Sequence, residues 1–251
     1  MLKVRDYAVL KELVQDESLN LGELDVSGIP QMPELFAESE RKDFSGIEKW
    51  NMSEVYDMTA MFYNARWFNH PINRWDVSAA EGMGEMFSGA ESFNQPLDRW
   101  NTCRARVMRR MFAGAKSFCQ DISTWDVQWV VDFSGMFQEA EAFNCDLSTW
   151  NVGCGERFMF MFMDAVSFDH DISNWAVDTG VPVAYRRFLK HEALGEPEPG
   201  NPRFIDPFVQ MFSGAEAFVK KFGEVEPKEY FAVLRKFTER YRNTPAQEFK
   251  V

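Results

Sequence analysis

Apolar residues along this chain recur with a period of 25 residues. Tryptophan keeps this period without a gap, and a Met-Phe pair, an alanine and a second phenylalanine follow it in a fixed order. The periodic tryptophans are Trp50, Trp75, Trp100, Trp125, Trp150 and Trp175, and the Met-Phe pairs begin at Met61, Met86, Met111, Met136, Met161 and Met211. A fixed period of this length is the signature of a repeat protein.

Within one unit, two different patterns follow each other. The apolar residues of the first half have the spacing of one face of a short helix; they are Val55, Met58, Met61, Phe62 and Ala65. The second half is rich in turn residues and ends in alternating apolar positions at Trp75 and Val77, which predicts a short strand. We therefore expect each unit to contain a helix, a turn and a short strand. Such a unit cannot bury its apolar face alone, so stacked copies would share one core.

Both ends of the chain differ from the repeats. Residues 1–23 are expected to form an N-terminal capping helix, and residues 219–251 a C-terminal capping or docking helix centred on 228–242. The repeats occupy 24–218, and within them 176–200 has lost nearly every signature. We interpret that stretch as a decayed repeat with an exposed loop. The predicted fold class is an α/β repeat, a solenoid of units of about 25 residues with helical caps at both ends.

Charge and composition exclude several functions. The net charge of −12 argues against nucleic acid as a partner. The longest apolar run, residues 158–163, is too short to span a membrane, and the first residues lack the apolar stretch of a secretory signal. We therefore expect the protein inside a cell or within an assembly. The four cysteines and three histidines have no metal-site spacing, and no catalytic motif is present, so we expect neither a cofactor nor an enzyme.

Residues 58–78 carry a pattern of the kind Met-x-x-Met-Phe-x-x-Ala-x-x-Phe-Asn-x-x-Ile-x-x-Trp-Asp-Val-Ser. This pattern resembles the BspA-like repeat family, once catalogued as a domain of unknown function, and the resemblance covers about 24–218. It implies a leucine-rich-repeat-like solenoid used for adhesion or protein binding. Proteins similar to it occur on bacterial and mycoplasma surfaces, in large viruses of algae and in marine protists.

Two groups of charged residues are candidates for binding. Asp121, Asp146 and Asp171 share one slot of the repeat, where each either accepts backbone N–H groups of its own turn or contributes to a weak Ca²⁺ site. Four arginines cluster in one repeat, either as a solvated face or as a docking site for an acidic partner; they are Arg104, Arg106, Arg109 and Arg110.

Aromatic and methionine residues outside the repeat pattern are the remaining candidates, because the shared core does not require them. They are Tyr63, Trp67, Trp129, Met159, Phe160 and Met163. Either the C-terminal segment folds back over the group at 159–163, or these side chains face a partner. The sequence therefore predicts a non-catalytic protein-interaction or scaffold solenoid. The alternative is a structural subunit built into a large assembly such as a virion or an organelle complex, and an adhesin or an enzyme is a weaker hypothesis.

Overall fold

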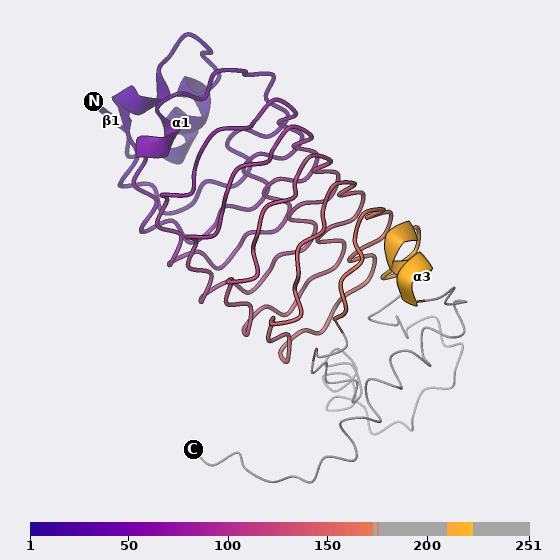
Figure 1. Cartoon of the computed structure of the whole chain (residues 1–251). Helices are drawn as coiled ribbons and strands as arrows, with labels where there is room; N and C mark the ends of the chain where they lie inside the picture. Colours follow the sequence, from indigo (N-terminus) through magenta and orange to yellow (C-terminus); the bar gives the residue numbers. More distant parts are fainter. Residues whose placement is uncertain (173–174, 176–209, 223–251) are drawn as a thin grey trace, which may run out of the picture.

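The computed structural model describes residues 1–172, 175 and 210–222. Its N-terminal end contains strand β1 (Leu2–Lys3), helix α1 (Tyr7–Leu13), the 3₁₀ turn η1 (Leu21–Glu23), strand β2 (Leu24–Asp25) and the 3₁₀ turn η2 (Ile47–Lys49). The two strands pair in parallel, with Leu2 opposite Leu24. Helix α3 (Glu216–Phe222) lies at the far end of the stack of coils in Figure 1. Within these ranges no other helix or strand is present.

Helix α1 is the helix that the sequence places within residues 1–23. Asp6 caps the N-terminus of α1 by accepting a hydrogen bond from the Ala8 amide at 2.7 Å. Leu10, on the inner face of the helix, is buried in the core. The Tyr7 hydroxyl donates a hydrogen bond to the Pro33 carbonyl. The helix is thereby attached to the first coil of the repeat region.

Residues 51–172 and Trp175 form five successive coils, each lying directly on the one before it (Figure 1). We number the positions of a coil from 1 to 25, so that Asn51 is position 1 and Trp75 is position 25. Position 7 of every coil forms a parallel bridge to the same position of the next coil, from Asp57 to Gly82 and onward to Arg157. Gln31 forms the equivalent bridge to Asp57 from the preceding coil, residues 26–50.

The helix expected in the first half of each unit is wrong: residues 58–65 form consecutive turns. The amide of Met61 donates to the Met58 carbonyl at 3.1 Å, and Ala65 donates to Phe62 at 3.0 Å. Ala60 and Asn64 have φ values of 54° and 53°, a left-handed conformation that an α-helix cannot contain. These turns begin at every second residue, from Met58 to Phe62. They bury Met58, Met61, Phe62 and Ala65, which have the spacing of one face of a helix.

The amides not used in these turns join neighbouring coils. Met58, Ala60, Phe62 and Asn64 each donate to a carbonyl of the following coil, at 2.7–2.9 Å. Every second amide is therefore satisfied within the coil and every other one between coils. The amides that point to the neighbouring coil find a partner only when that coil is present. The sequence of one unit does not contain this partner, and its apolar spacing alone therefore predicts a helix.

The strand expected at Trp75–Val77 is also absent. The Trp75 amide closes a turn onto the Ile72 carbonyl at 3.0 Å, and no ladder forms there. The indole N–H of Trp100, one coil further on, donates to the same carbonyl at 3.2 Å. Each tryptophan from Trp50 to Trp175 repeats this contact to the preceding coil. The alternation of Trp75 and Val77 therefore marks two buried corners of a coil rather than one face of a strand.

Stacked aromatic rings fill the core along the axis of the coils. The phenylalanines at position 12 lie 5.5–5.8 Å apart between ring centroids, and those at position 18 lie 5.5–6.1 Å apart. Nearly parallel rings at this separation match the spacing of the coils. The phenylalanine excess in the composition is largely explained by these two ladders.

The coil after residues 151–175 is formed by residues near 211–218. The Phe162 amide donates to the Met211 carbonyl at 2.8 Å, and the Phe162 and Phe212 rings stack at 5.5 Å. No coil lies between them, although the sequence register allows for one. Phe212 continues the ladder, whereas Arg186 and Arg187, which hold the Met-Phe slots of the decayed repeat, would place two cations in the core. The decayed repeat at 176–200 and the C-terminal helix expected at 228–242 lie outside the described residues.

Candidate interaction surface

The candidate residues that the sequence singles out lie in three places on the coils. We call the first the Trp129 surface, which comprises Arg104, Arg106 and Trp129 at positions 4 and 6. The second is Trp67 at position 17. The third is the turn edge at positions 9, 10 and 13, which comprises Tyr63, Arg109, Arg110, Met159, Phe160 and Met163. The structure therefore divides both the arginine cluster and the group of aromatic and methionine residues between these places.

In the Trp129 surface, an exposed indole lies against a guanidinium. Positions 2 and 5 of this coil, Val127 and Val130, point into the core, so the side chain between them at position 4 faces solvent. Trp129 is 46% exposed, and the Arg106 guanidinium lies 5.3 Å from the centroid of its ring. Arg104 is exposed at the same position of the preceding coil. The fold does not need an aromatic residue here, because Glu54 and Cys154 hold position 4 elsewhere.

Trp67 has a similar environment one coil from the N-terminal end of the repeats. It is 49% exposed, and its indole N–H donates to Glu40 at 3.2 Å. The Lys42 ammonium lies 5.2 Å from the ring centroid. Glu40 and Lys42 both belong to the preceding coil, so the indole bridges two coils on the outside of the stack.

The turn edge holds its six candidate residues on different coils. Met159, Phe160 and Met163 are half-buried and lie two coils beyond Arg109 and Arg110. Phe160 has a φ of 60°, which is a strained conformation for a bulky side chain. Arg109 pairs with Glu85 of the preceding coil at 2.5 Å. Tyr63, which is also half-buried, lies four coils from Met163 and does not belong to the same patch.

Two of the three aspartates that share one slot, Asp121 and Asp146, accept hydrogen bonds within their own turns. Asp121 accepts a hydrogen bond from the Ser123 amide at 2.9 Å, and Asp146 accepts one from the Ser148 amide at 2.9 Å. These hydrogen bonds hold the pKa of both carboxyl groups below the usual range. Asp171 is exposed at the same position. In the described part of the chain, no group of three or more His, Cys, Asp or Glu side chains has the arrangement of a metal site.

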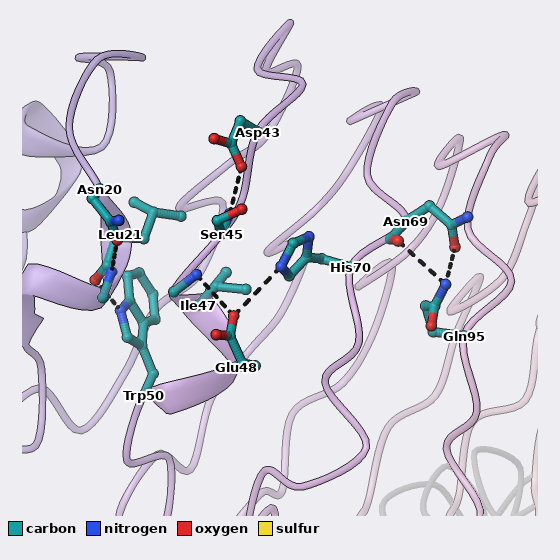
Figure 2. Close-up of polar contacts among 12 residues, drawn as sticks. Asn20, Leu21, Asp43, Ser45, Ile47, Glu48, Trp50, Asn69, His70 and Gln95 are labelled. Atoms are coloured by element: carbon teal, nitrogen blue, oxygen red, sulfur yellow. Dashed lines mark hydrogen bonds and ion pairs between the residues drawn. The ribbon is translucent and has the colours of Figure 1, made fainter.

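Polar side chains on the outside of the stack join neighbouring coils, as Figure 2 shows. Asn69 accepts hydrogen bonds from the Asn94 amide at 3.0 Å and the Gln95 side chain at 2.9 Å. His70 lies 3.4 Å from Glu48 of the preceding coil. Further along the same face, burial raises the pKa of the Cys145 thiol to about 11, so this thiol is protonated and contacts Asp121 at 3.4 Å. These contacts join neighbouring coils, and the polar side chains that form them are already paired within the protein.

A column of basic residues at position 24 was not found by the sequence analysis. Lys49, Arg74 and Arg99 are exposed on three successive coils. Each directly precedes the tryptophan of its repeat, so a Lys/Arg-Trp pair in three consecutive units was the available signal. Because these residues follow the period, a search for residues outside the pattern passes over them.

Comparison with known proteins identifies the repeats. No helix of the described residues is long and apolar enough to cross a bilayer. No curated protein and no solved structure matches the chain. The sequence model of the family described as "Mycoplasma protein of unknown function, DUF285" matches residues 9–115 and again residues 98–193. Two overlapping matches of this kind are consistent with a BspA-like repeat family. Because the two matches together cover most of the length of the chain, the chain belongs to the DUF285 family.

Proposed function

We propose that this protein is a non-catalytic interaction or scaffold protein, in which a leucine-rich-repeat-like solenoid of the BspA type presents variable coil positions to a protein partner. Its binding centre in this proposal is the Trp129 surface, with Trp67 as a second contact. The proposal is supported by the repeated family match and by the way each coil uses the same inner positions for the core, which leaves the outer positions free to vary.

The single observation that carries the proposal is the exposed pair of Trp129 and Arg106. An indole that is 46% exposed leaves apolar area in water, which a partner would cover. Tryptophan and arginine are also the residues most enriched among those that dominate the energy of protein interfaces. Because the Arg106 guanidinium already lies over the ring, the two side chains would lose little conformational freedom on binding.

The proposed absence of catalysis has its support in the use of the acidic groups. Asp121 and Asp146 are ionised and held by their own turns, so they are poorly suited to exchange protons near neutral pH. Cys145 is a protonated, buried thiol and therefore a poor nucleophile.

Quantitative affinity capture from the native host tests the proposal. We expect the double variant Trp67→Ala with Trp129→Ala to lose specific proteins that the unchanged chain retains. The matched control is Tyr56→Ala, which removes another exposed aromatic side chain, 45% exposed, from position 6. If the double variant retains the same proteins as the unchanged chain, the Trp129 surface is not the binding centre. If the Tyr56 control loses them as well, the loss is not specific to that surface.

A further inference from the structure

Three exposed cations form a column along one corner of the first coils. Lys49, Arg74 and Arg99 occupy position 24 of successive coils, and all three are exposed. Among the described residues, none of the three forms an ion pair, although the protein carries an excess of acidic groups. Beyond Arg99 the column ends, because Thr124 and Thr149 hold this position in the next two coils.

The carboxylates nearest in sequence to this column are engaged by other donors. Glu48 accepts a hydrogen bond from the Gly46 amide at 2.8 Å and lies 3.4 Å from His70. Asp76 accepts one from the Ser78 amide at 3.0 Å. Asp98 accepts one from the side-chain amide of Asn73 at 2.8 Å. Within the described residues, the three cations therefore do not neutralise acidic groups of the chain itself.

A hollow of about 310 Å³ opens between the two arginines of the column. Arg74 and Arg99 line it together with Asn73, Trp75, Asp76, Val77 and Asn101. Asn101 uses its side-chain oxygen to accept the Cys103 amide at 3.2 Å, so its amide N–H groups are the polar donors that remain. Two guanidinium groups beside an amide donor make a site suited to a carboxylate.

The spacing of the column fits an extended polypeptide that runs along the stack. Core rings of the two arginine coils stack 5.5–5.7 Å apart between centroids, and Phe36 of the coil that carries Lys49 stacks 5.5 Å from Phe62, so each coil advances the stack by about this distance. Side chains on one side of an extended strand are about 6.6 Å apart, because each residue advances about 3.3 Å. The long side chains of lysine and arginine can absorb this difference of about 1 Å per step.

Like charges at this separation repel each other. A partner that carries carboxylates would offset this repulsion. A dense polyanion fits less well than a peptide. The ionised Asp76 carboxylate lines the hollow and the net charge is −12, so repulsion grows with the charge density of the ligand. It is greater for nucleic acid than for a peptide whose carboxylates alternate with neutral residues.

We infer that the column of Lys49, Arg74 and Arg99 binds an acidic segment of a protein partner, extended along the axis of the coils with alternate carboxylates facing the three cations. This site is separate from the Trp129 surface, and it does not depend on the function proposed for that surface.

Fluorescence anisotropy tests the inference with a fluorescein-labelled peptide that has glutamate at alternate positions and serine between. The test variant is Arg74→Gln with Arg99→Gln. The control is Arg66→Gln with Lys116→Gln, which removes the same charge from two exposed side chains at position 16. We expect the Kd of the test variant to rise about tenfold or more and that of the control to change less than about twofold, since each lost bidentate contact removes a charge-assisted pair. All of the exchanged side chains are exposed, and circular dichroism checks that both variants fold.

Three results would overturn the inference. One is no saturable binding of the peptide to the unchanged chain at low salt. Another is an equal loss of affinity in the test and control variants, which would show that only net charge matters. The last is displacement of the peptide by single-stranded DNA at a lower concentration than by unlabelled peptide, which would assign the column to a nucleic acid.

Discussion

The tryptophan ladder makes a prediction that separates packing from hydrogen bonding. Trp125 is buried, and its ring stacks on that of Trp100 at 6.1 Å between centroids. Its indole N–H donates to the Leu97 carbonyl of the preceding coil at 3.0 Å. The same carbonyl also accepts the backbone amide of Trp100 at 3.1 Å. Trp125→Phe therefore removes one hydrogen bond without leaving a buried carbonyl unpaired.

The expected cost follows from these contacts. Loss of a buried hydrogen bond whose acceptor keeps another partner costs about 1 kcal/mol. The smaller ring of phenylalanine gives up roughly 40 Å² of buried apolar area, which adds about 1 kcal/mol. We therefore expect Trp125→Phe to lower the free energy of unfolding by about 2 kcal/mol. Trp125→Ala also opens a cavity, and we expect it to cost about 3–5 kcal/mol.

Urea unfolding followed by circular dichroism measures both changes, and Trp129→Phe is the control. It makes the same substitution at a tryptophan that is 46% exposed and has no hydrogen bond to the preceding coil, so it should cost less than about 0.5 kcal/mol. If Trp125→Phe lowers the free energy of unfolding no more than the Trp129→Phe control does, the indole hydrogen bond does not have the role given to it. A Trp125→Phe variant as unstable as Trp125→Ala would show that the coil cannot accept any other ring.

Three further predictions concern backbone conformation, pH and thiol reactivity. Gly114→Ala should lower the free energy of unfolding by about 1–2 kcal/mol, because its φ of +67° is unfavourable for alanine, although the new Cβ would lie no closer than 3.7 Å to another atom. Gly46→Ala should lower it more, because its Cβ would lie 2.1 Å from the Gly22 nitrogen. The midpoints of urea unfolding rank the two variants. The pKa values of Asp121 and Asp146 are lowered from 3.8, so the stability they contribute is complete above that value and falls as the pH drops below it. The double variant Asp121→Asn with Asp146→Asn should therefore lose less stability than the unchanged chain between about pH 7 and pH 3, and an equal loss would contradict this. Cys145, with a pKa of about 11, should react about 100-fold more slowly with a thiol reagent near pH 8 than a thiol with the ordinary pKa of 9.0. Mass spectrometry of the labelled peptides measures the rate. Rapid labelling of Cys145 in the folded state would contradict its burial.

The period of the sequence locates the buried positions well, because every coil has to place the same side chains on the shared core. It identifies the local structure badly. Apolar residues at Met58, Met61, Phe62 and Ala65 satisfy a helix and a run of turns equally. Glycines at position 14, such as Gly89 and Gly114 with φ of 71° and 67°, were a signal for the left-handed turns. The hydrogen bonds between coils decide the outcome, and they are absent from any single unit.

For the candidate surfaces, too, the sequence identifies single residues but not the contacts between coils. Trp67 and Trp129 could be found because they depart from the pattern, and both prove to be about half exposed. The pairing of Trp129 with Arg106 could not be found, because it joins two neighbouring coils across 23 positions of sequence. The column that includes Arg74 and Arg99 was missed because it follows the period and so looks like part of the scaffold.

Site-specific photo-crosslinking tests the central claim, that outer positions of the coils bind a protein partner through the Trp129 surface. The photoreactive residue p-benzoylphenylalanine would replace Trp129 in one variant and Ala79, which holds the same position two coils earlier, in the other. In extracts of the native host, we expect a discrete crosslinked protein from the Trp129 variant and none from the Ala79 variant. The same crosslinked proteins from both positions, or none from either, would contradict it.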